Sequence, residues 1–205
     1  CSFAGVPHRN SADQEPLLEL PSQHRVPLSW LSQHGGEIIA LRCLTELAPA
    51  GTVDPAAIDA ARQAVVASKP AAAVVKKQKD TGVWAGNLLG LAASKATGVK
   101  DVGTIPQYRR LLQMGYPLTG RPFKLADRLL FRLLSRDDDP ALLFEFRKMA
   151  AGDTHAESWA RWVIREASCA ALAEAGHIED PRLRGSAHKV ASAVSQFLRS
   201  TLSEK

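Results

Sequence analysis

The sequence predicts an all-α protein in which antiparallel helix pairs stack into a superhelix or form part of a closed ring, with about eight or nine helices. Leucine and alanine recur three or four residues apart through most of the chain, which is the spacing of one helical face. No segment alternates apolar and polar residues with the period of two that marks a half-buried strand. Aromatic residues make up only 6% of the 205 residues, which argues against a β-sandwich because strands favour aromatic and β-branched side chains.

The first 26 residues have the composition of a disordered tail. They contain Pro7, Pro16 and Pro21 and little apolar periodicity, so they bury too little apolar surface to offset the entropy of ordering. We therefore expect a disordered tail over residues 1–26 and a single all-helical domain over residues 27–200. The chain starts at Cys1 without a methionine, and we interpret the domain as a fragment of a longer chain.

Prolines, glycines and capping residues place the helices of the first half. Leucines at helical spacing predict a helix over residues 27–48, and Gly35 with the glycine after it predicts a break within that helix. Asp54 followed by Pro55 is an N-cap with proline at the first helical position, and it predicts a helix to about Ser68. Further helices are expected from Pro70 to about Lys79, from Trp84 to Ser94, and from Thr104, as the cap, to Gly115.

The most regular segment of the chain follows Pro122. Its apolar residues share one helical face, with Phe131 beside them: Leu125, Leu129, Leu130, Leu133 and Leu134. This spacing predicts an amphipathic helix. Three more helices are expected: from Asp139 and Pro140 to Gly152, over residues 156–175, and from Asp180 and Pro181 to about Leu198.

The same Asp-Pro start is predicted for three helices, at Asp54, Asp139 and Asp180. Asp139 precedes Asp180 by 41 residues and follows Asp54 by 85, close to twice that interval. One helical hairpin of a repeat array has about 40 residues. In this spacing, over residues 28–198, the chain resembles HEAT-like and armadillo-like helical-repeat proteins, which implies stacked hairpins whose concave face binds a partner. The alternative is that Asp-Pro is a good helix start used three times by chance.

A second resemblance concerns the segment around Trp84, Gly86 and Asn87. A helix that opens in this way after a glycine-containing turn is similar to the inner helices of terpene-cyclase and prenyltransferase rings. Such rings need more helices than this chain provides. The resemblance therefore implies a fragment of a ring whose catalytic residues lie outside the 205 residues.

Four cations follow one another at four-residue intervals and form the basic row: Lys124, Arg128, Arg132 and Arg136. On an α-helix the row drifts by only about 40° per step, so it makes a stripe opposite the leucines. Such a stripe suits a phosphate backbone, as on the concave face of HEAT-like proteins that bind nucleic acids. The alternative is a solvated face whose long arginine stems cover apolar surface.

Three aspartates directly after the basic row match no acid motif. A diphosphate-binding aspartate cluster requires a carboxylate where Ala141 stands, and the acid motif of triterpene cyclases requires one where Arg136 stands. We interpret Asp139 as the cap of the next helix, and Asp137 and Asp138 as part of a solvated turn.

Trp159, Arg161, Trp162 and Arg165 form a second candidate binding surface. Indole and guanidinium groups at this spacing can stack on a base, a sugar or the side chain of a partner. The alternative is that the two indoles pack in the core, because they share a helical face with Val163.

Metal, disulfide and cofactor sites are not expected. Three cysteines, Cys1, Cys43 and Cys169, lie far apart, and no histidine stands four residues from another histidine or a cysteine. The sequence contains no phosphate loop, dinucleotide motif or nucleophile elbow. Its longest apolar runs are too short to span a membrane.

The net charge of +5, from 26 Lys and Arg against 21 Asp and Glu, does not identify a class of partner. We expect a non-catalytic helical-repeat domain that binds a protein or another macromolecule through one face. The alternatives are a fragment of a helical-barrel enzyme acting on a sugar or an isoprenoid, and a nucleic-acid binder that uses the basic row. We expect a cytoplasmic location; the alternative is a mature bacterial lipoprotein anchored at Cys1.

Overall fold

A computed structural model of the chain describes residues 27–91, 101–135 and 140–200. Within these ranges it contains nine α-helices and no strand beyond an isolated bridge between Gln78 and Trp84, so the all-α prediction is confirmed. The predicted tail lies outside the described residues. In chain order the elements are α1 (Leu28–His34), α2 (Gly36–Arg42), the π-helix η2 (Cys43–Leu47), α3 (Pro55–Ala67), α4 (Lys69–Lys76), α5 (Thr104–Gln113), α6 (Arg121–Ser135), the 3-10 helix η3 (Pro140–Phe146), α7 (Arg147–Ala150), α8 (Thr154–Glu174) and α9 (Pro181–Leu198).

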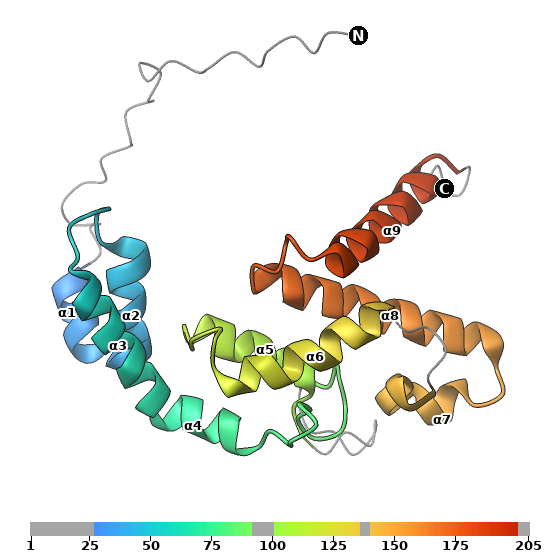
Figure 1. The fold of residues 1–205 in the computed structure, drawn as a ribbon, viewed down its shortest axis with the longest axis horizontal. Helices are drawn as coiled ribbons and strands as arrows, with labels where there is room; N and C mark the ends of the chain where they lie inside the picture. Colours follow the sequence, from blue (N-terminus) through green and yellow to red (C-terminus); the bar gives the residue numbers. More distant parts are fainter. Residues whose placement is uncertain (1–26, 92–100, 136–139, 201–205) are drawn as a thin grey trace, which may run out of the picture.

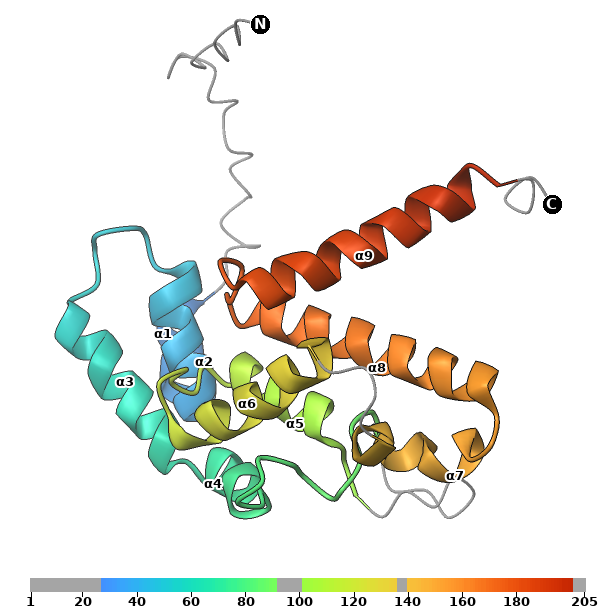
Figure 2. The ribbon, with the colours of Figure 1, turned by 45° about the vertical axis from the view of Figure 1, so that its right-hand side comes forward.

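The helices α5 and α6 occupy the middle of the molecule, between the group formed by α1, α2 and α3 and the long helix α8 (Figure 1). α8 packs against α5, α6, α7 and α9. α9 turns back from the end of α8, and its C-terminal end points away from the other helices (Figure 2). The stacking of helix pairs as a repeat stays a prediction.

The helices α3 and α9 each begin after an aspartate whose side chain caps the helix, as the Asp-Pro pairs predicted. A side-chain oxygen of Asp54 accepts a hydrogen bond from the Ala56 amide at 3.0 Å, and one of Asp180 accepts from the Arg182 amide at 2.9 Å. Both helices therefore begin as predicted, at the proline that follows the cap. The predicted break at Gly35 separates α1 from α2. Asp139 lies outside the described residues.

The segment 78–91 is not helical, so the helix predicted from Trp84 is wrong over its described part; residues 92–94 lie outside the described ranges. Glycine is the reason. Gly82, just before the predicted helix, and Gly86, inside it, take φ values of +87° and +71°, which lie in the left-handed region where a helix cannot continue. Glycines four residues apart are the signal that should have argued against a helix here.

Trp84 is buried in this non-helical segment and is held by hydrogen bonds. Its indole N–H donates to the Val74 carbonyl at 2.8 Å, and its amide donates to the Thr104 hydroxyl oxygen at 3.1 Å. The Thr104 hydroxyl in turn donates to the Asn87 carbonyl at 3.0 Å. Thr104 is therefore the first residue of α5, preceded by Gly103, and not its predicted cap.

Glu145 joins the non-helical segment to η3. Its two carboxylate oxygens accept hydrogen bonds from the consecutive amides of Leu88, at 2.8 Å, and Leu89, at 2.7 Å. The residue before it, Phe144, has a φ of +45°, which is rare for a residue other than glycine. A single side chain thus satisfies two backbone donors that have no helical partner.

The core lies where α5, α6 and α8 meet. α6 contributes the most, because its apolar face is buried along its whole length: Pro122, Phe123, Ala126, Leu130, Phe131, Leu133 and Leu134. The predicted amphipathic helix is confirmed, although Leu125 and Leu129 are only half-buried. Among the described helices none is both long enough and apolar enough to cross a membrane.

Candidate functional site

The basic row lies on the outer side of α6. Lys124, Arg128 and Arg132 are all exposed, opposite the buried face of the helix. Arg136 lies outside the described residues. The described members therefore have the position of a solvated face, and their role in binding stays a prediction.

Trp159 and Trp162 differ in exposure and in their partners, and their use as a binding surface stays a prediction. Trp159 is 50% exposed and meets Phe146 edge to face, with ring centroids 5.7 Å apart. Trp162 is half-buried, and its indole N–H donates to Glu166 at 2.7 Å. Arg161 is bonded to a carboxylate one helical turn earlier, at 2.6 Å, and Arg165 is half-buried.

The alternative of core packing is wrong for Trp159. The buried stripe of α8 runs through its neighbours Ala160, Ile164 and Leu172, so it is displaced by one residue from the face that the indoles share. Small side chains such as Ala160 let α8 approach the rest of the core closely. Large apolar side chains such as tryptophan usually mark the buried face of a helix, but in α8 the buried face is marked by smaller side chains.

Within the described residues, the apolar face of α9 is fully buried in its first two turns and becomes exposed toward its end. Leu183 and Ser186, in the first two turns, are its buried residues. The same face continues with the α9 stripe, which we define as Val190, Val194, Phe197 and Leu198. The last three of these residues are 52%, 55% and 65% exposed. The face loses its cover because α9 leaves the body of the molecule, as Figure 2 shows.

The charges on α9 are all positive. Between Pro181 and Leu198 the helix contains Arg182, Arg184 and Lys189 and neither Asp nor Glu. Arg182 pairs with the capping Asp180, and Arg184 pairs with Glu179, both at the base of the helix. Lys189 lies beyond these carboxylates, beside the start of the α9 stripe, so an apolar surface with a cationic border extends from the body.

A buried polar network joins α5, α6 and the turn before α9. The hydroxyl of Tyr108 donates to the Asp127 carboxylate at 2.7 Å, and His177 Nε2 lies 3.3 Å from the other carboxylate oxygen. Burial raises the pKa of Asp127, although the bond from Tyr108 and the nearby His177 oppose this shift. Burial, together with the bond to the carboxylate, also raises the pKa of Tyr108 above its ordinary value.

This network is part of the core. Tyr108 is fully buried, so its hydroxyl cannot reach a substrate. His177 packs edge to face on Phe131, with centroids 5.3 Å apart, and the guanidinium of Arg182 lies 4.1 Å from the centre of the same ring. These contacts fix the start of α9 on α6. The network therefore sets the direction in which α9 leaves the body.

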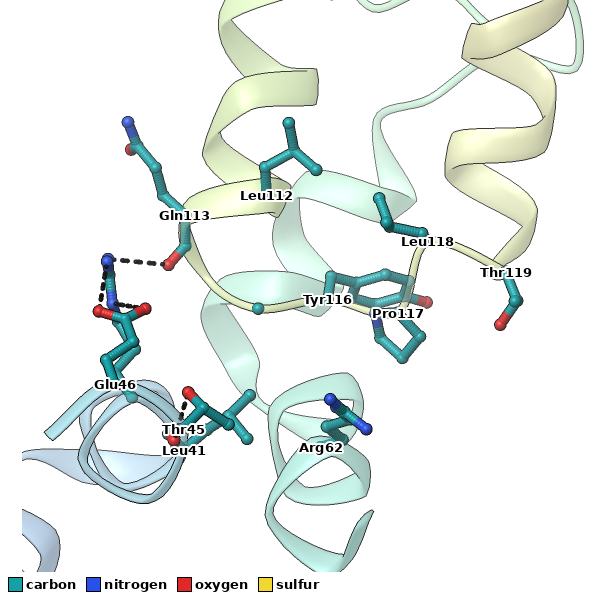
Figure 3. A pocket seen from close by; sticks show the side chains of 12 residues that line it. Leu41, Thr45, Glu46, Arg62, Leu112, Gln113, Tyr116, Pro117, Leu118 and Thr119 are labelled. Atoms are coloured by element: carbon teal, nitrogen blue, oxygen red, sulfur yellow. Dashed lines mark hydrogen bonds and ion pairs between the residues drawn. The ribbon is translucent and has the colours of Figure 1, made fainter. Parts of the chain in front are cut away.

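A cavity of about 480 Å³ opens between α2 with η2, α3 and the turn that joins α5 to α6. Figure 3 shows Tyr116 and Pro117 on one wall, with Arg62 across the cavity from them. Leu41 and Leu112 add apolar surface. No sequence motif indicated this cavity, because its walls come from segments far apart in the chain.

No group of three or more His, Cys, Asp or Glu side chains in the described ranges is arranged to hold a metal ion. The chain matches no protein-family model, and comparisons with curated proteins and with solved structures gave no significant match. The geometry of the chain itself therefore carries the functional argument, and its most distinctive surfaces are the α9 stripe and the cavity at α2, α3 and the α5–α6 turn.

Proposed function

We propose that the chain is a non-catalytic helical interaction domain, and that α9 binds a groove of a partner protein. The observation that carries the proposal is the α9 stripe. Val190, Val194 and Phe197 follow one another at intervals of four and three residues, which is the pattern of anchors that an amphipathic helix inserts into an apolar groove. An aromatic anchor flanked by aliphatic ones supplies most of the affinity in such interfaces.

We infer the chemistry of the partner from the charge of α9. A groove bordered by Asp and Glu would complement Lys189, which lies beyond the carboxylates that pair with Arg182 and Arg184. A second copy of this chain fits less well, because pairing α9 with itself sets cations against cations. The partner we propose is therefore a protein with an apolar groove and an acidic rim.

The projection of α9 supports this proposal. Its buried residues lie in the first two turns, so the last turns can enter a groove without separating α9 from α6 and α8. A bound helix that is already folded also avoids the entropic cost of ordering on binding. Binding should therefore leave the core of the domain unchanged.

The first test uses designed probes of known chemistry. The full chain is titrated with two amphipathic helical hairpins that present the same leucine groove, one bordered by glutamate and one by lysine, and binding is followed by fluorescence anisotropy. We expect the acidic hairpin to bind at least tenfold more tightly than the basic one. Equal affinity for both, or preference for the basic hairpin, would contradict the proposed charge complementarity.

A matched pair of variants locates the binding surface. Phe197→Ser removes the aromatic anchor of the α9 stripe, and Trp159→Ser removes a similarly exposed aromatic side chain from α8. Phe197 is 55% exposed and Trp159 is 50% exposed. We expect only Phe197→Ser to weaken binding of the acidic hairpin, by tenfold or more. Equal losses would place the contact elsewhere.

Anionic lipid is the competing ligand for a basic amphipathic helix. Vesicles of phosphatidylcholine with and without phosphatidylglycerol are sedimented with the chain. We expect no cosedimentation with either. Cosedimentation that needs phosphatidylglycerol and is lost in Phe197→Ser would replace the protein groove with a membrane surface.

A further inference from the structure

The cavity between α2, α3 and the α5–α6 turn lies beside the contact between that turn and α2. Gly115, at the end of α5, has a φ of +73°, and a Cβ there would lie 2.6 Å from Leu41 Cδ2. The positive φ favours glycine here, and a larger residue would also have to displace the Leu41 side chain. Arg42 Nη1 donates to the Gln113 carbonyl at 3.3 Å and ties the same two elements together.

The residues that line the α2 side belong partly to η2. In this π-helix the Ala48 amide bonds to the Cys43 carbonyl at 2.9 Å, five residues back. Thr45 and Glu46, both within η2, line the cavity. A π-turn is less stable than regular α-helix and occurs frequently where side chains must be redirected at a functional site.

The two arginines of the cavity differ in how they are bonded. Arg42 donates from Nε and Nη2 to the two carboxylate oxygens of Glu46, both at 3.0 Å, so its charge is matched. Among the described residues, Arg62 forms an ion pair with Asp59 at 3.3 Å, and these side chains are 49% and 74% exposed. An exposed pair of this kind is weak, so Arg62 can turn to a ligand at little cost.

The apolar walls lie beside this cation. Tyr116 and Pro117 face Arg62 across the cavity (Figure 3), and Leu41 and Leu112 complete the apolar part. The volume of about 480 Å³ lies within the range of small-molecule sites. A ligand that fits has an apolar body, which meets the ring and the leucines, and an anionic group within reach of the guanidinium.

The charge balance favours a single negative charge. Of the two arginines that line the cavity, Arg42 is matched by Glu46, so a ligand meets the single charge of Arg62, which is weakly paired with Asp59. The cavity also lies at the C-terminal end of α5, where the negative end of the helix dipole opposes two negative charges more than one. Both effects disfavour a phosphate dianion.

We propose that this cavity binds a small monocarboxylate with an aromatic or branched aliphatic body, held by Arg62 and by the apolar wall of Tyr116, Pro117 and Leu112. The site is separate from the α9 stripe, so it goes beyond the interaction function. Arg62 and the carboxylate form the charged contact, and the apolar body excludes water from it.

The experiment uses fragments that differ in one group. The ¹⁵N-labelled chain is titrated with benzoate, benzyl alcohol, benzylamine and phenyl phosphate, and chemical shifts are followed. We expect benzoate to shift the amides of residues 41–46 and 112–119 with a dissociation constant of roughly a millimolar. Benzyl alcohol should bind at least fivefold more weakly. Shifts spread over the surface, or none at the cavity, would overturn the proposal.

Two arginine variants separate the site from general charge. Arg62→Gln should weaken benzoate binding by about fivefold to tenfold, whereas Arg184→Gln, which removes an exposed and paired arginine of α9, should leave it unchanged. Both arginines are largely exposed, so folding is preserved. Equal affinities for the two variants, or tighter binding of phenyl phosphate than of benzoate, would show that the proposed ligand class is wrong. Because no residue of α9 lines the cavity, failure here leaves the proposed partner groove intact.

Discussion

The helices α6 and α9 have the same pattern of apolar and basic residues, but they differ in how much of the apolar face is buried. Both are amphipathic, and both carry arginines and lysines on the polar side. α6 buries seven residues along its length, whereas α9 buries two, both near its start. An apolar helix face therefore predicts that this face is buried in a contact, but it does not show whether the contact is made within the same chain or with another molecule. In α6 the cover is the core, and in α9 we propose that it is a partner.

The largest expected effect lies in the buried face of α6. Leu130 is fully buried, so Leu130→Ala removes apolar contacts and leaves a cavity. We expect the free energy of unfolding to fall by about 2–5 kcal/mol in urea titrations. The same change at the exposed Leu198 should alter it by less than about 0.5 kcal/mol. A comparable loss at Leu198 would mean that the chain itself covers the α9 stripe.

Tyr108→Phe tests the network that connects α6 to the start of α9. At neutral pH the free energy of unfolding should fall by about 1–3 kcal/mol, because the half-buried Asp127 loses a hydrogen-bond donor. The pKa of Tyr108 is raised in the folded chain, so the folded form keeps its proton above pH 10, where the unfolded form releases it. The stability from this proton is complete below about pH 10 and is lost as pH rises further, by up to about 1.4 kcal/mol per pH unit.

The measurement for this prediction is urea unfolding of both proteins from pH 7 to 11. The difference between wild type and Tyr108→Phe should shrink above about pH 10, because only the wild type pays this penalty. A difference that stays constant up to pH 11 would contradict the raised pKa.

Asp180→Ala removes the cap of α9 and should lower the free energy of unfolding by about 1 kcal/mol. Asp180→Asn keeps the cap and loses the bond to Arg182, so it should cost less. The bond to Arg182 lowers the pKa of Asp180 to about 2. The carboxylate's contribution is therefore present above its ordinary pKa near 3.8 and is lost as pH falls toward 2. Urea titrations between pH 5 and 2.5 should show the wild type approaching Asp180→Asn; parallel curves would exclude this linkage.

The smallest effect is expected for the polar sides of the two helices. Two double variants are compared. One carries Arg128→Glu and Arg132→Glu on α6, and the other carries Arg184→Glu and Lys189→Glu on α9, so both change the net charge by the same amount. Retention on heparin should fall by the same amount in both, as for general attraction to a polyanion. A much larger loss for the α6 pair, with a reduced salt slope, would establish the basic row as a nucleic-acid site.

The parts of the fold that local chemistry determines could be predicted from the sequence. Asp180 with Pro181 fixed the start of α9, and the leucine spacing identified the buried side of α6. The segment around Trp84 could not be predicted from apolar content, because its conformation depends on glycines in the left-handed region and on bonds to Val74 and Thr104. These bonds exist only after the chain has folded.

The candidate sites were harder to predict. The exposure of the α9 stripe depends on the direction of the helix, which the contacts of His177 and Arg182 with Phe131 determine. The cavity is built from α2, α3 and the α5–α6 turn, and no local pattern shows that Arg62 lies opposite Tyr116. Sequence reasoning pointed instead to residues that are prominent for their charge or size, such as Arg128 and Trp159.

Glu145 has a consequence for how the folding of this chain can be observed. The amides of Leu88 and Leu89 lie outside any helix, yet they are bonded to a carboxylate more than fifty residues later in the chain, 57 and 56 residues away. Their exchange with deuterated water should therefore be slow only while η3 is docked, whatever the state of the helices between them. Two neighbouring signals in an exchange spectrum thus report whether η3 is docked on the non-helical segment 78–91.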